Sequence, residues 1–173
     1  MCIRDSLYTK NGDCLFVMKG IDSGAENTLL SNATEYAREY GSMVLEYYGA
    51  HVFSAVADEL EGILGKMETV HGSVSAAFSS CTTVTLAGHS FGGSQLELLA
   101  YLATLADDPR GIGMQPVHSY AFMPTPVFFG SSPTNPMAAD GCYPTTAYYT
   151  SVPPSLTGLS AEVVDVSRFH RYH

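Results

Sequence analysis

Hydrophobic residues recur at helical spacing in the middle of the chain. The first apolar stripe comprises Val52, Phe53, Val56, Leu60, Ile63, Leu64 and Met67. Charged residues such as Asp58 and Glu61 lie between them, so the pattern predicts an amphipathic helix that packs on a sheet. Gly62 and Gly65 either weaken the second half of this helix or permit close approach of a neighbour.

A second helix is expected between Ser94 and Ala106. Its apolar stripe comprises Leu96, Leu99, Ala100 and Ala103. Glu97 is the only charged residue in this stretch, so we expect a helix that is buried on most of its sides.

Short apolar runs predict the strands. Residues 14–18 are apolar without interruption, which is typical of a parallel strand that is covered on both faces. Further strands are expected at 84–86 and 117–123, and a last short one at 161–165. The segment 72–80 is small and polar and reads as a connection.

Alternation of strands and helices indicates an α/β fold, with a mostly parallel sheet and helices on both faces. A short helix is also expected within 27–40, and one domain is expected over 7–173. Prolines are frequent from 124 to 154, which argues against an ordinary helix or a central strand. We expect a long irregular insertion there, either a lid over a site or a loop packed down by its own aromatic residues.

Composition narrows the possible partners. The chain has 173 residues and a formal charge of −9, which argues against nucleic acid because phosphate binding needs a basic face. Contact with a lipid interface remains possible, since it needs an apolar face. No apolar run approaches the roughly 20 residues that span a bilayer, and no signal peptide is recognisable. The compartment is therefore unknown, and Met1–Ser6 does not read as a native start.

The cysteines are Cys2, Cys14, Cys81 and Cys142. They show neither a C-x-x-C motif nor the spacing of metal ligands, so we predict no metal site and no disulfide. Cys14 and Cys81 are expected to be small core residues.

Gly88, Ser90 and Gly92 form a G-x-S-x-G motif between a predicted strand and a predicted helix. A serine at such a corner has a strained backbone, and glycines two residues before and after it relieve the crowding. The helix N-terminus favours developing negative charge, and the backbone N–H of Phe91 would be one oxyanion donor. The motif predicts a nucleophile elbow with Ser90 as nucleophile; the plainer alternative is a glycine-rich turn that contains a serine.

With these pieces in place, the chain resembles the class 3 (fungal-type, diacylglycerol-lipase-like) lipases of the α/β-hydrolase fold. The likeness spans roughly residues 14–169 and is most specific at 88–93, which match G-H-S-L-G-G with Phe in place of Leu. Three weaker likenesses are the strand ending in R-G at 15–20, the F-A-P-P-P-V-F segment at 121–128 and the D-x-V-P-R-L segment at 165–169.

The resemblance implies a serine hydrolase that cleaves carboxylic esters of acylglycerols or related lipids through an acyl-enzyme, without cofactor or metal. Its partners would be a lipid or small ester and, transiently, a lipid interface. It implies the N–H groups of Phe91 and Ile21 as oxyanion donors, and Asp165 as the acid. The chain departs from the family at Lys19, where Arg is usual, and at Ile21, which lacks the common hydroxyl.

In this fold the nucleophile is followed by the acid and then by the histidine. Asp140 is the second candidate for the acid, although it precedes a glycine in a turn-like pair. No histidine is well placed: His89 adjoins Ser90 and reads as structural, while His170 and His173 follow Asp165 too closely. We therefore expect the catalytic histidine beyond residue 173, in a chain that is incomplete at its C-terminus.

Two other functions remain open. One is a different α/β-hydrolase activity, such as that of a carboxylesterase or a thioesterase. The other is a non-catalytic, lipase-like binding domain, which the lack of an evident histidine favours.

Overall fold

The computed structural model describes residues 5–20, 44–105, 107–108, 110–114, 116–122, 124, 127–129 and 145–148. Its elements in chain order are β1 (Asp5–Lys10), β2 (Asp13–Met18), β3 (Val44–Tyr47), β4 (Ala50–Phe53), α2 (Ser54–His71), α3 (Val74–Phe78), β5 (Thr83–His89), α4 (Phe91–Thr104), β6 (Pro116–Phe122), β7 (Phe128–Phe129) and β8 (Thr145–Tyr148).

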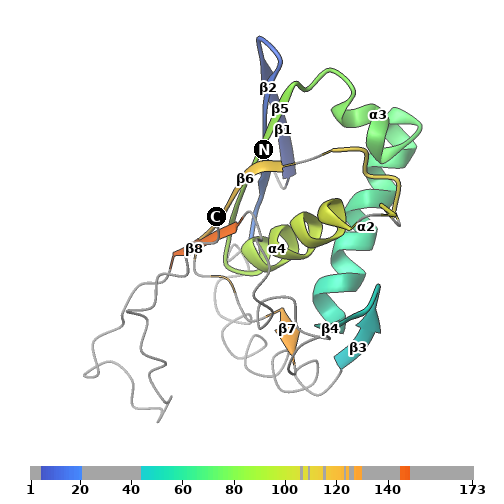
Figure 1. Ribbon diagram of the computed structural model, residues 1–173, viewed down its shortest axis with the longest axis vertical. Coiled ribbons are helices and arrows are strands. Elements are labelled where there is room, and N and C mark those ends of the chain that lie inside the picture. The colour runs from blue at the N-terminus through green and yellow to red at the C-terminus, as the bar shows by residue number, and fades with distance from the viewer. Residues whose placement is uncertain are drawn as a thin grey trace, which may run out of the picture.

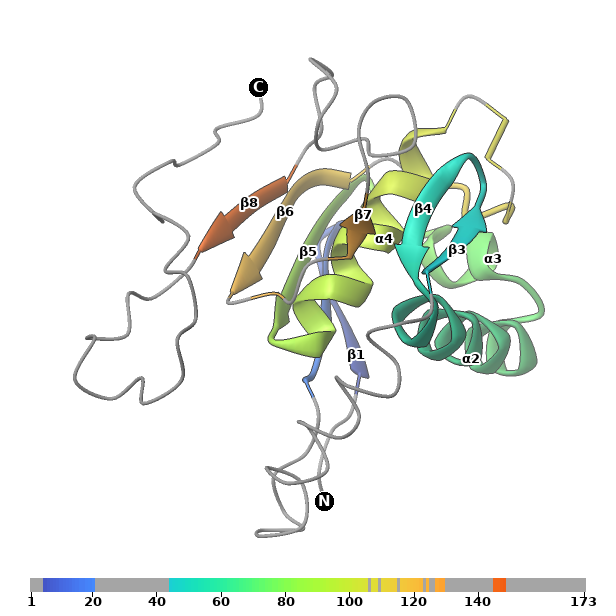
Figure 2. The same cartoon turned by 90° about the horizontal axis from the view of Figure 1, so that it is seen from below.

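The main sheet has the strand order β1-β2-β5-β6-β8 (Figure 1). Strands β2, β5, β6 and β8 run parallel, and β1 pairs antiparallel with β2 at the edge. A second, small sheet of order β3-β4-β7 lies on the same side of the main sheet as the helices (Figure 2). The expected α/β fold with a mostly parallel sheet is therefore confirmed for the described residues.

Helices α2, α3 and α4 all lie on one face of the main sheet, here called the inner face (Figure 1). Strand β2 alternates accordingly, because Cys14, Phe16 and Met18 are buried whereas Asp13 and Leu15 are exposed. The expectation that β2 is covered on both faces is wrong, because Leu15 on the outer face is exposed and Val17 is only half-buried. The expected helices on the second face are not among the described elements.

Helix α4 is the centre of the core. Eleven of its fourteen residues are buried, as expected from its near lack of charge. Helix α2 packs against it, and the buried residues of α2 include Val56, Leu60 and Leu64. The sequence placed the start of this helix too early, because Val52 and Phe53 belong to strand β4. No atom beyond the helix itself lies within 4 Å of a Cβ built on Gly62 or Gly65, so neither glycine serves a close approach.

Several elements lie where none was expected. Helix α3 occupies part of the presumed connection at 72–80, and Ser73 caps it by accepting a hydrogen bond from Ala76 N (3.0 Å). Strand β8 lies within the proline-rich stretch and pairs in parallel with β6, which corrects the expectation of irregular structure at these residues. Prolines are frequent in this stretch, but Thr145–Tyr148 contains none. Its β-branched and aromatic residues favour a strand.

A disulfide joins Cys14 and Cys81, with their Cα atoms 5.6 Å apart. This corrects the expectation of two unpaired core cysteines. Cys14 lies at the start of β2, and Cys81 lies just before β5, the parallel neighbour of β2. The pairing therefore follows from the sheet register, which brings together two residues 67 positions apart.

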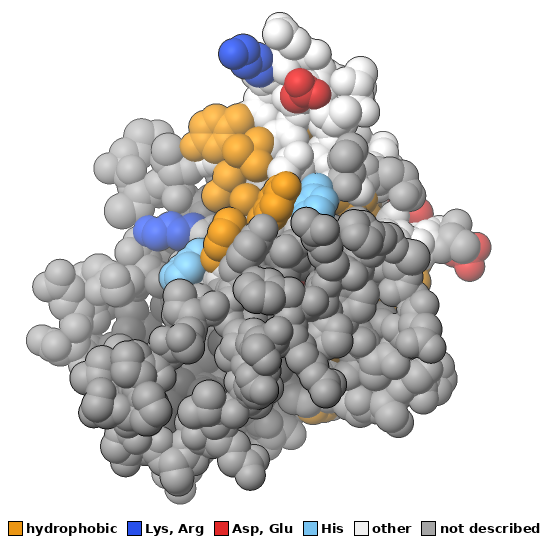
Figure 3. Space-filling view, turned by 60° about the vertical axis from the view of Figure 1, so that its left-hand side comes forward, with side chains coloured by type: hydrophobic (Ala, Val, Ile, Leu, Met, Phe, Trp, Pro, Cys, Tyr) orange, Lys and Arg blue, Asp and Glu red, His pale blue; other side chains and the backbone are white. Residues whose placement is uncertain are grey.

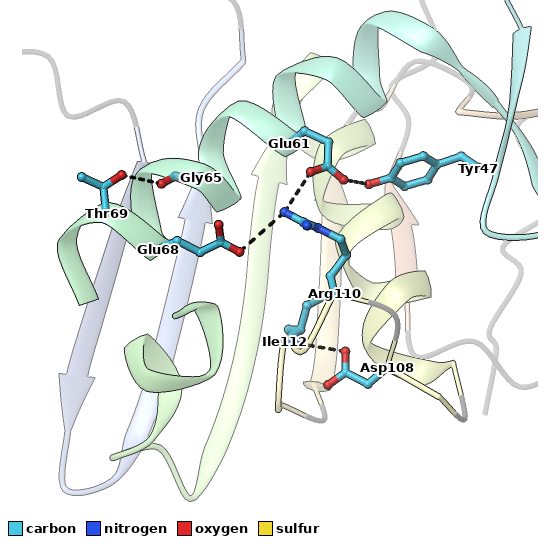
Figure 4. Close-up of polar contacts among 8 residues, drawn as sticks. All are labelled: Tyr47, Glu61, Gly65, Glu68, Thr69, Asp108, Arg110 and Ile112. Carbon is cyan, nitrogen blue, oxygen red and sulfur yellow. Dashed lines mark hydrogen bonds and ion pairs between the residues drawn. The ribbon is translucent and has the colours of Figure 1, made fainter. Parts of the chain in front are cut away.

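A polar cluster fastens α2 to the segment after α4 (Figure 4). Arg110 lies 2.9 Å from a Glu61 carboxylate oxygen, and Tyr47 donates a hydrogen bond to the other oxygen of Glu61. Burial and this bond raise the pKa of Tyr47. Asp108, in the turn after α4, accepts hydrogen bonds from the N–H groups of Ile112 (2.9 Å) and Gly113 (2.8 Å). The cluster lies away from Ser90 and fixes the path from α4 to β6.

Candidate active site

Ser90 stands at the corner between β5 and α4, with φ 54° and ψ −128°. A residue other than glycine rarely adopts a positive φ, and such a backbone conformation costs on the order of 1–3 kcal/mol. The surroundings hold the serine there: its N–H donates to the Phe122 carbonyl of β6 (2.9 Å), and its carbonyl accepts from the N–H of Gly93 (2.9 Å). Ser90 is thus presented at the carboxyl edge of the parallel strands.

The glycines beside Ser90 are required by close backbone contacts. A Cβ on Gly88 would lie 2.4 Å from the carbonyl oxygen of Gly92. The crowding expected from the G-x-S-x-G spacing is therefore present, and neither position accepts a larger residue without a backbone shift. A Cβ on Gly92 would also lie 2.5 Å from the carbonyl oxygen of Met18, at the end of β2.

The segment after β2 lies directly against Ser90. A Cβ on Gly20 would lie 3.0 Å from Cβ of Ser90 and 2.7 Å from the carbonyl oxygen of His89. The sequence placed an oxyanion loop in this segment, and Lys19 and Gly20 do lie beside Ser90. Ile21, the residue proposed to donate from this loop, falls outside the described residues.

Phe91 is the first residue of α4, so its N–H has no acceptor within the helix. The first turn of a 14-residue helix also carries partial positive charge, which favours an anion beside Ser90. The N–H of Phe91, which the sequence predicts to be an oxyanion donor, therefore has no intrahelical acceptor and adjoins Ser90. On its other side the first turn contacts the chain after β6, because a Cβ on Gly93 would lie 3.3 Å from Cβ of Pro124.

The two candidate acids, Asp165 and Asp140, lie outside the described residues, as do His170 and His173. Among the described residues, no histidine forms a hydrogen bond with Ser90. His89 is exposed at the end of β5, although the sequence indicated a structural role for it. The described residues therefore contain the proposed nucleophile and one oxyanion donor, without the acid and base that would activate them.

A pocket of about 370 Å³ adjoins the elbow on the outer face of the main sheet, the face opposite α4. Its walls include Tyr8, Val17, Ala87 and Phe122, and Lys19, Gly20 and His89 also line it. Figure 3 shows hydrophobic side chains gathered over this part of the outer face, with lysine and histidine beside them. The sequence did not predict this pocket, since it depends on which strands are neighbours.

Glu97 is buried in α4, with only 3% of its surface exposed, and its Oε1 has no hydrogen-bond partner among the described residues. Desolvation by burial raises the pKa of this carboxyl from 4.5 to about 8. The sequence singled out Glu97 as the lone charge of its helix, which indicated burial of the helix but not of the carboxyl itself.

Within the described residues, no group of three or more His, Cys, Asp or Glu side chains lies close enough to hold a metal ion. None of the helices in the described ranges combines the length and the apolar character needed to cross a membrane. Comparison of the chain with protein-family models, with curated proteins and with solved structures gives no match.

Proposed function

We propose that this chain is a serine hydrolase of the α/β-hydrolase type, similar to class 3 lipases, which cleaves carboxylic esters of acylglycerols or related lipids. The observation that carries the proposal is the backbone of Ser90, held at positive φ between a parallel strand and a helix N-terminus. A protein retains a strained non-glycine residue only where its surroundings impose it, and such residues cluster at functional sites. Gly20, whose Cβ position lies 3.0 Å from Cβ of Ser90, supports the proposal of a donor loop after β2.

In the proposed reaction, Ser90 Oγ attacks the ester carbonyl while a histidine takes its proton. The N–H groups of Phe91 and Ile21 stabilise the resulting oxyanion, and Asp165 orients the histidine, with Asp140 as the alternative acid. Collapse of the tetrahedral intermediate releases the alcohol, which receives the proton and leaves an acyl group on Ser90. Water, deprotonated by the same histidine, then cleaves this acyl-enzyme, so the net reaction consumes one water and no cofactor.

A fluorophosphonate probe tests the proposal, because it reacts with a serine only when that serine is activated. The full-length protein that contains this chain should be labelled, and Ser90→Ala should abolish the labelling. Ser79→Ala is the matched control, since Ser79 is exposed in a turn after a helix and should be without effect. Labelling that persists in Ser90→Ala would refute the assignment.

A second candidate is a non-catalytic binding domain of the same fold. The observation that favours it is that no histidine among the described residues hydrogen-bonds with Ser90. A full-length protein that resists the probe under all conditions, yet is folded, would support this candidate against the hydrolase.

A further inference from the structure

Strand β1 forms one edge of the main sheet. Among the described strands it pairs only with β2, so the other side of β1 presents backbone N–H and C=O groups that no described strand takes up. The pairing with β2 is regular over all six residues, and β1 contains no proline. Bulges and prolines are two of the devices by which proteins close such an edge. Without them, β1 can accept a further strand.

A groove of about 330 Å³ lies between this edge and helix α2, on the inner face of the sheet. Leu7 of β1 points toward the groove, because its register partner Phe16 is one of the buried inner-face residues of β2. Ile63, Met67 and Val70 form the opposite wall, at the spacing of one helix face. The groove is therefore apolar on both sides, and Figure 2 shows β1 at the end of the sheet that is nearer to α2.

The apolar walls of this groove are incompletely covered. Val70 is 74% exposed, and Leu7 and Met67 are only partly buried. Single apolar residues are ordinary on a protein surface, but these three meet beside an open strand edge. A strand added to β1 would direct every second side chain into the groove, since successive side chains of a strand alternate between the two faces. Main-chain pairing together with a pocket for alternate side chains is the basis of peptide recognition by strand addition.

Charge favours an acidic partner over a second copy of this chain. Lys66 and His71 line the groove and are exposed, and Lys10 is exposed at the end of β1. Neither lysine forms an ion pair within the part of the chain that the structure describes. In a two-fold contact the same surface lies on both sides, so the lysines of one copy would face those of the other. An acidic segment would instead neutralise them, although the chain as a whole carries a formal charge of −9.

We propose that the open edge of β1 and the groove beside α2 form a docking surface for an extended, acidic segment of another protein, which adds a strand to the main sheet. Apolar side chains of this segment enter the groove beside Val70, and its carboxylates lie near Lys66 and Lys10. The groove shares no residue with the pocket on the outer face. The docking surface is therefore independent of the proposed hydrolase activity.

A fluorescein-labelled peptide of alternating valine and glutamate, about eight residues long to match a typical strand, tests the proposal on the full-length protein that contains this chain. The fluorescence anisotropy should rise to saturation. A peptide with lysine in place of glutamate should bind at least about tenfold more weakly. Amide hydrogen exchange within β1 should become slower in the complex, because the added strand takes up the N–H groups of its open edge.

Val70→Glu should weaken binding of the valine–glutamate peptide at least about tenfold, because the new carboxylate enters the groove wall and repels the glutamates. The exposure of Val70 makes the fold tolerant of this change. Thr69→Glu is the matched control, since it adds the same charge to an exposed neighbour on α2 that does not line the groove. This variant should bind like the wild type. Lys66→Glu should reverse the preference, so that the valine–lysine peptide binds better.

Three results would overturn the proposal: no saturable binding to the wild type, equal binding by Val70→Glu and Thr69→Glu, or unchanged exchange of the β1 amides in the complex. Sedimentation of the protein alone tests the other occupant. The wild type should show no association through this surface. A concentration-dependent dimer that Val70→Glu abolishes would assign the surface to a second copy and would equally overturn the proposal.

Discussion

Glu97 makes the stability of this protein depend on pH in a direction that can be worked out from its environment. Its carboxyl is buried in α4, the helix that begins directly after Ser90, and only desolvation raises its pKa. A carboxylic acid with a raised pKa binds its proton more tightly in the folded than in the unfolded chain. The stability is therefore fully present below pH 4.5, falls as the pH rises, and stops falling only above about pH 8.

The size of the effect follows from this shift. Each pH unit between the two pKa values costs about 1.4 kcal/mol of folding free energy. Glu97→Met keeps a flexible side chain of similar length and has no proton to gain, so it removes this dependence. The stability of the variant relative to the wild type should therefore increase by roughly 2 to 3 kcal/mol between pH 5 and pH 7.

Urea unfolding followed by circular dichroism at several pH values measures this quantity. The comparison across pH cancels the constant contribution of the methionine itself, so only the proton linkage remains. Glu59→Met, which removes an exposed carboxylate from α2, is the control. A difference between Glu97→Met and wild type that is the same at pH 5 and pH 7 would show that the carboxyl ionises without hindrance, and the burial argument would fail.

Two further predictions concern the scaffold of the site. Gly88→Ala should destabilise the fold by several kcal/mol, because its Cβ would meet the backbone of Gly92 at 2.4 Å, whereas Gly62→Ala should stabilise it by roughly 0.5–1 kcal/mol; urea unfolding decides both, and equal effects would contradict the elbow geometry. Cys14→Ser should lower the stability by about 4 kcal/mol, the closure entropy of a 67-residue loop. Reduction of the wild type should give the same loss, and a variant of unchanged stability would show that Cys14 and Cys81 are not paired.

The two long helices and the turn at Ser90 could be predicted from the sequence, because the interactions that form them are between residues close in sequence. The period of the apolar residues in 56–67 indicated α2, and the lone charge at Glu97 indicated the burial of α4. The predicted start of α2 was wrong at Val52 and Phe53. These two residues belong to β4, which leads directly into the helix and continues its apolar pattern. Nothing in the local pattern marks that boundary; the pairing of β4 with β3 and β7 decides it.

Contacts between segments far apart in the sequence could not be predicted in this way. Strand β8 lies among prolines that argue against regular structure, and it forms because β6 offers a parallel edge. Residues 14–18 form a continuous apolar run in the sequence, yet Leu15 is exposed and Val17 lines the pocket on the outer face. An apolar run alone does not tell whether one face or two are covered.

By itself, the sequence determined the corner at Ser90, because the steric conflict between positions 88 and 92 arises within five residues and only glycine relieves it. It also determined the two long helices and the mostly parallel sheet, through periodicities that a few turns or strands suffice to express. Only the tertiary structure decided that Cys14 meets Cys81, that Gly20 lies against Ser90, that the Glu97 carboxyl is desolvated and that a pocket opens on the outer face. Each of these depends on which strands become neighbours, and the path of the whole chain sets that order.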